Sequence, residues 1–101
     1  MYLYGCTIKL YESGVLYIPK KCLTESGFEP MATQAGIIYK PGLIFLYRDP
    51  DRGENVKIRK GKIRIDKAWM DENRITTDTI LYMTAHRDGV VFGVSPILFR
   101  P

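Results

Sequence analysis

The two halves of this chain resemble each other when the sequence is shifted by 47 residues, so that Gly14 falls on Gly61. The shift needs no gap and aligns six identical pairs: Gly14 with Gly61, Ile18 with Ile65, Lys20 with Lys67, Glu25 with Glu72, Gly42 with Gly89, and Phe45 with Phe92. Most of these positions are turn glycines and apolar residues, where structure restricts the residue type most. We therefore predict a duplication within a single domain, 1–101. Its repeat units are 7–47 and 55–94, joined by a surface linker, 48–54.

Each predicted unit contains two strands, a short helix and a hairpin, in that order. The expected strands are 7–11, 15–18, 35–39 and 43–47 in the first unit, and 55–59, 62–65, 79–85 and 90–94 in the second. Pro19 and Asp66 favour helix starts, and Gly27 and Asn73 are expected to end the helices. Segments 2–4 and 97–99 are candidates for extra edge strands. A ββαββ unit of about 40 residues cannot bury its sheet faces alone. We therefore predict a mainly β fold with two short helices, in which two units form a pseudo-two-fold β-barrel.

The composition is that of one globular domain. Hydrophobic residues make up 46% of the 101 residues and charged residues 26%, which argues against disorder. No apolar run approaches the roughly 18 residues that a membrane-spanning helix needs. The N-terminus also lacks the basic and apolar segments of a secretory signal. Cys6 and Cys22 form no CxxC pair, so we expect two thiols in a cytosolic protein.

The densest group of positive charges lies between residues 57 and 67. Its members are Lys57, Arg59, Lys60, Lys62, Arg64 and Lys67. In a regular hairpin with a turn at Gly61, Lys57 and Arg59 would project from the same side as Lys62 and Arg64. Such a basic β-ribbon binds phosphates of nucleic acid with strong salt dependence. The alternative is that these charges only solvate the outer face of an amphipathic hairpin.

A motif around the first predicted helix resembles the AbrB/MazE/SpoVT swapped-hairpin superfamily, which includes SymE-like proteins. Residues 14–23 match its Gly-x-x-x-Ile-Pro-x-x-x-Leu pattern, and Ser26-Gly27-Phe28 resembles its helix end. The resemblance implies a tandem, single-chain version of a fold that relatives build from two chains. It also implies a DNA-binding regulator or antitoxin. The chain departs from the family where Val15 and Lys62 replace an arginine after the turn glycine. It departs again where Leu23-Thr24 and Met70-Asp71 replace a basic pair.

Catalytic chemistry finds little support in the sequence. The single histidine, His86, comes directly before a predicted turn, and one histidine with two cysteines is too few for the common zinc sites. The sequence contains no phosphate-binding loop, nucleophile elbow or HExxH motif. We therefore predict a protein that is not an enzyme, with no catalytic residue, metal or cofactor.

Two functions remain as predictions. The first is a small nucleic-acid-binding regulator, of DNA or RNA, that contacts phosphates through the six basic residues. The second is a protein-binding module, a small inhibitor or adaptor of phage or mobile-element type, with Trp69, Tyr17 and Tyr82 at its interface. Cross-strand packing is a sufficient explanation of the tyrosines, with a stacking platform for bases or a protein interface as the alternatives, and partial burial in the core is the alternative for Trp69. Duplication predicts a monomer, although basic ribbons that bind as pairs leave a homodimer open.

Overall fold

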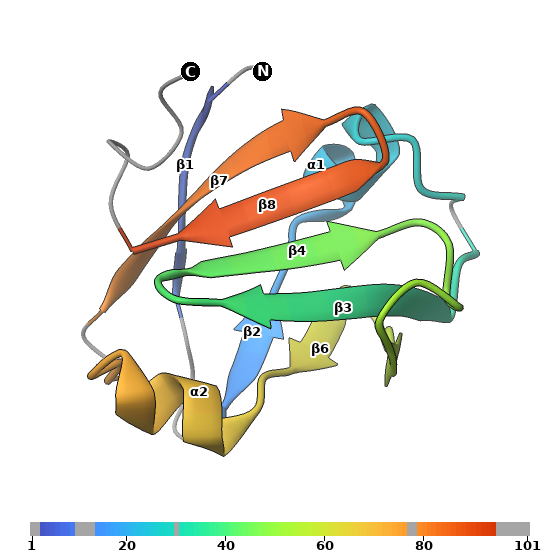
Figure 1. Ribbon diagram of the computed structural model, residues 1–101. Helices are drawn as coiled ribbons and strands as arrows, with labels where there is room; N and C mark the ends of the chain where they lie inside the picture. Colours follow the sequence, from blue (N-terminus) through green and yellow to red (C-terminus); the bar gives the residue numbers. More distant parts are fainter. Residues whose placement is uncertain (1–2, 10–13, 30, 77–78, 95–101) are drawn as a thin grey trace.

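The computed structural model describes residues 3–9, 14–29, 31–76 and 79–94 (Figure 1). Its elements in chain order are β1 (Leu3–Lys9), β2 (Val15–Tyr17), α1 (Lys20–Glu25), β3 (Gln34–Lys40), β4 (Leu43–Tyr47), β5 (Glu54–Lys57), β6 (Lys62–Arg64), α2 (Lys67–Glu72), β7 (Ile80–His86) and β8 (Gly89–Gly93). The fold is therefore mainly β with two short helices, as predicted. None of the described helices has the length and apolar character needed to cross a membrane.

The strands form two antiparallel sheets. The large sheet has six strands in the order β1-β7-β8-β4-β3-β5, and the small sheet has two, β2 and β6. The predicted hairpins β3–β4 and β7–β8 are present, with Pro41-Gly42 and Arg87-Asp88 as their turns. The predicted edge segment 2–4 falls partly within β1, which merges it with most of the next predicted strand. Residues 97–99 lie outside the described part of the chain.

One prediction about strand pairing is wrong. We expected 55–59 and 62–65 to form a regular hairpin, but β5 pairs with β3 and β6 pairs with β2. Only Arg59 and Lys62 pair across the turn. The chain diverges there because each side finds a better partner: Ile58 extends the β5–β3 ladder by donating its N–H to Thr33 O (2.8 Å) and is buried. On the other side, Ile63 of β6 lies directly opposite Leu16 of β2, and both are buried.

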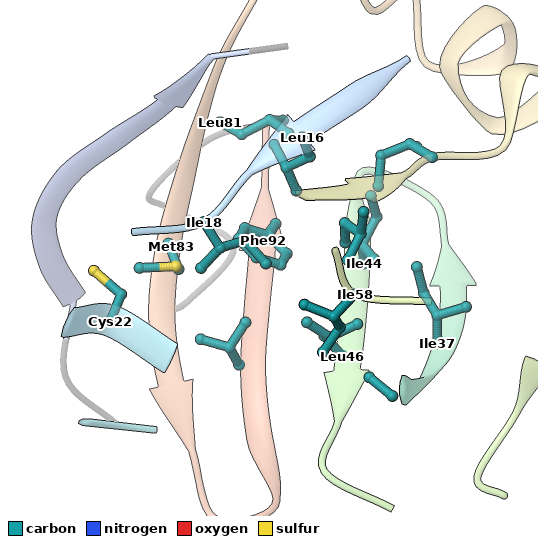
Figure 2. Close-up of a cluster of buried hydrophobic side chains, with 14 of the residues drawn as sticks. Leu16, Ile18, Cys22, Ile37, Ile44, Leu46, Ile58, Leu81, Met83 and Phe92 are labelled. Atoms are coloured by element: carbon teal, nitrogen blue, oxygen red, sulfur yellow. The ribbon is translucent and has the colours of Figure 1, made fainter. Parts of the chain in front are cut away.

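Both sheets contribute to one hydrophobic core (Figure 2). Leu16 and Ile63 come from the small sheet, and Ile44, Leu81 and Phe92 come from the large one. Figure 2 shows Phe92 near the middle of the cluster, with Ile18 and Met83 on one side of it and Ile44 on the other. Neither sheet is closed among the described strands, so the β-barrel and the duplication stay predictions.

The two helices start as predicted, but one of them ends differently. Asp66 caps α2 by accepting a hydrogen bond from Ala68 N–H (3.2 Å), and Pro19 precedes α1. Gly27 takes the left-handed conformation after α1, with φ of 86°. After α2 this conformation belongs to Arg74, with φ of 56°, and not to Asn73, with φ of −102°. Asn73 therefore does not end the helix in the left-handed conformation, and its side chain bonds instead to Gly42 N–H and Trp69 O.

Candidate nucleic-acid interface

The turn between Ile58 and Ile63 organises the basic segment. Lys60 and Gly61 both have positive φ, 51° and 78°, which is the conformation of the two-residue turns that suit the twist of β-hairpins. Arg59 and Lys62 close the turn with two backbone hydrogen bonds of 3.0 and 2.9 Å. Gly61 is required by space as well as by conformation, because a Cβ atom there would lie 2.7 Å from Ile18 O. The turn is therefore held firmly against the end of β2.

The outer face of the small sheet combines two kinds of side chain. In β6, Lys62 and Arg64 are exposed while Ile63 points into the core, as the alternation of the sequence predicts. Opposite them in β2, Tyr17 pairs with Lys62, and Val15 pairs with Arg64. Tyr17 is 43% exposed, whereas Val15 is half-buried. Two cationic groups thus stand beside one aromatic ring and one small apolar side chain.

A depression of about 300 Å³ gathers most of the predicted basic residues. We call it the basic hollow and define it by its lining residues, which are Val15, Lys57, Arg59, Lys60, Lys62, Ile63 and Arg64. Five of the six predicted binding residues therefore meet here, although the hairpin expected to present them is broken. The sixth, Lys67, lies at the start of α2 and lines a neighbouring depression that also contains Glu54, Asp66 and Arg64.

No side chain of the basic hollow forms an ion pair with a residue in the described part of the chain. Its lining includes no acidic side chain. The ion pair that the described residues form is elsewhere, between Arg52 Nη1 and Asp88 Oδ2 at 3.3 Å. Like charges gathered at one surface repel each other, and their arrangement is favourable only where solvent or an anionic ligand screens them.

Trp69, a residue of the alternative protein-binding prediction, belongs to the core. It is 4% exposed, and its indole N–H donates to Lys40 O at 2.8 Å. Its ring lies 6.0 Å from that of Tyr39. Mainly through burial, the pKa of Tyr39 is raised above its usual value, and the Tyr39 hydroxyl accepts a hydrogen bond from Asp66 N–H (2.9 Å). In this position Trp69 is a packing residue and offers no exposed anchor to a partner.

The other two residues of that alternative differ from each other. Tyr82 is half-buried within β7, between β1 and β8 in the large sheet. Tyr17 is exposed at the outer face of the small sheet and therefore lies beside the basic hollow.

A second pocket, which the sequence did not predict, also includes the Lys60–Gly61 turn in its lining. We call it the side pocket; its volume is about 330 Å³. Its lining is Tyr17, Ile18, Lys20, Leu23, Thr24, Phe28, Glu29, Ala32, Ile58, Lys60 and Gly61. These residues come from two distant parts of the chain, 17–32 and 58–61, so the sequence of either part alone does not predict the pocket. The sequence holds one indication of this pocket. Tyr17 alternates with the apolar Leu16 and Ile18 in a predicted strand, so its ring is expected on the outer face.

Comparison with protein-family models, with curated proteins and with solved structures found no match to this chain. Among the described residues, no three His, Cys, Asp or Glu side chains gather where a metal ion could bind. The two depressions are therefore the features of the described residues that bear on function.

Proposed function

We propose that this chain is a small nucleic-acid-binding regulator, related to the AbrB-like antitoxin type, that contacts phosphates through the basic hollow. The observation that carries the proposal is the convergence of five cationic side chains on one depression that has no acidic residue in its lining. Phosphate oxygens are the anionic groups that Lys and Arg neutralise in nucleic-acid complexes. Lys67 contributes at most a peripheral contact, because Glu54 and Asp66 share its depression.

The proposal includes a duplicated, pseudo-two-fold barrel, and two reciprocal hydrogen bonds support it. Ile18 N–H donates to Gly61 O (2.7 Å), and Ile65 N–H donates to Gly14 O (2.8 Å). The shift of 47 residues that relates the two sequence halves converts one bond into the other. The small sheet also adjoins both edges of the large one, since β2 contacts β1 and β6 contacts β5. This arrangement is the one expected if the small sheet completes a barrel between the edge strands.

The experiment that tests the function measures fluorescence anisotropy of labelled random duplex DNA between about 50 and 200 mM salt. Five phosphate contacts correspond to a slope of about −4.5 for log affinity against log salt, so the affinity should fall roughly 500-fold over this fourfold range. The variant Lys62→Glu with Arg64→Glu should lower the affinity by more than about tenfold at the lowest salt, and it should flatten the slope.

The matched control is Lys40→Glu with Arg87→Glu, which changes the net charge equally. Both residues are exposed, and neither lines the basic hollow. This control should retain most of the affinity if location matters more than total charge. Equal losses in the two variants would show that only net charge attracts the DNA. Absence of binding at the lowest salt, to the duplex and to a single strand of the same sequence alike, would reject the proposal and direct attention to a protein partner.

A further inference from the structure

We infer that the side pocket receives an unpaired nucleobase, so that the preferred ligand is single-stranded nucleic acid. This inference rests on the proposed function, because it assumes that the basic hollow holds phosphates. What it adds is the geometry of the second depression, which lies directly beside the first and shares Lys60 with it.

The two depressions adjoin each other at the Lys60–Gly61 turn. Lys60 lines both of them, and the ring of Tyr17 lies close to the turn, because a Cβ on Gly61 would be 3.2 Å from Tyr17 Cε2. A strand whose phosphates follow the basic hollow therefore passes Lys60 before it reaches the side pocket. The sugar next to the phosphate at Lys60 carries a base, which can enter the side pocket.

The chemistry of the side pocket suits a base better than a second phosphate. Ile18, Phe28 and Ile58 are buried residues of its apolar wall, and Tyr17 adds an exposed aromatic ring. Stacking on aromatic rings is the sequence-tolerant way in which proteins hold unpaired bases. The lining also contains Lys20 and Lys60, whose charge Glu29 offsets in part, and the exposed carboxylate of Glu29 can accept hydrogen bonds from base N–H groups. Its volume of about 330 Å³ lies at the small end of ligand sites, which span roughly 300–1,000 Å³.

A duplex cannot use both depressions in this way. Its bases are paired and stacked inside the helix, and moving one out costs unstacking and unpairing energy. A single strand exposes its bases without that cost. The arrangement therefore favours a single strand over a duplex of the same sequence.

The test compares the affinity of the intact protein for a labelled single-stranded DNA of mixed sequence, about 12 nucleotides long, with its affinity for the matching duplex. The single strand should bind more tightly. Tyr17→Ala should weaken single-strand binding about tenfold and leave duplex binding unchanged, whereas Tyr17→Phe should retain the affinity because the ring remains. Circular dichroism and thermal unfolding of each variant establish that it is folded.

A second variant tests the pocket without removing Tyr17. Thr24 is an exposed residue of α1 that lines the side pocket, so Thr24→Trp should occlude the pocket and remove the preference for the single strand. If the duplex binds as tightly as the single strand, and both variants bind like the original protein, the inference is wrong while the proposed function stands. If neither nucleic acid binds at low salt, the proposed function itself fails.

Discussion

The two strands of the small sheet, β2 and β6, are alike on their inner face and different on their outer face. Inside, Leu16 and Ile63 lie directly opposite each other and are 0% and 2% exposed. Outside, β2 presents Val15 and Tyr17 where β6 presents Lys62 and Arg64. The core allows little variation at the inner positions, whereas the outer positions can differ without cost to packing. The difference in the outer face is what produces one basic hollow on this sheet.

The two helices also occupy equivalent places in the sequence halves but differ in the contacts that they make. α1 buries Cys22, and α2 buries Trp69. The larger residue of α2 brings its own polar contact, the bond from its indole N–H to Lys40 O. Asn73 adds a second contact to the same hairpin, because its Oδ1 accepts a hydrogen bond from Gly42 N–H (2.8 Å). α2 is thus tied to the β3–β4 turn, while α1 leaves room beside it for the side pocket.

The largest loss of stability should come from substitutions on the inner face of the small sheet, where β2 and β6 are alike. Leu16→Ala and Ile63→Ala should each lower the free energy of unfolding by about 2–5 kcal/mol, since each leaves a cavity in a closed core. Chemical denaturation of the two variants measures this directly. Met31→Ala serves as the control, because Met31 is 87% exposed and its loss should change stability by less than about 0.5 kcal/mol. If one of these two variants lost much stability and the other almost none, the inner faces of β2 and β6 would not be equivalent.

The sequence predicts the elements of this fold better than their partners. Alternation of apolar and polar residues correctly places Ile63 in the core and Lys62 and Arg64 outside it. The same pattern says which face of a strand is buried and nothing about which strand lies beside it. The pairing of β5 with β3 and of β6 with β2 therefore could not be derived locally, because it depends on contacts between distant segments.

In the candidate site, too, local features could be predicted from the sequence and features that depend on distant segments could not. Five of its basic residues could be named from the sequence because charge clustering is local. The side pocket could not, because it forms only when α1, the following loop and the Lys60–Gly61 turn come together. Trp69 illustrates a third case: its helical position allows both an exposed anchor and a core residue, and its burial depends on contacts with distant residues, such as the ring of Tyr39 and Lys40 O.

Substitutions at the ends of the two helices should lower the free energy of unfolding by intermediate and unequal amounts. Asn73→Ala should lower the free energy of unfolding by about 1–3 kcal/mol, because it leaves the buried Gly42 N–H without its acceptor. Ser26→Ala should cost less than about 1 kcal/mol, since the Ser26 hydroxyl donates to Cys22 O, which also accepts from Ser26 N–H. Asn73→Asp retains an acceptor for Gly42 but loses the hydrogen bond that Asn73 Nδ2 donates to Trp69 O (2.8 Å), so it should recover only part of the stability. Thermal and chemical unfolding of the three variants give the comparison, and equal losses at positions 26 and 73 would contradict it.

The smallest change in stability should come from substitution of Arg74, and this change should be a gain. This exposed residue takes the left-handed conformation that Gly27 takes after α1, and a side chain with a Cβ atom is strained there. Arg74→Gly should raise the free energy of unfolding by up to about 1 kcal/mol, because relief of the strain exceeds the entropy that glycine adds to the unfolded chain. Arg74→Ala is the matched control, since it removes the charge and retains the Cβ atom. If alanine stabilises the protein as much as glycine, the gain comes from the lost charge, and the two helix ends differ in electrostatics and not in backbone strain.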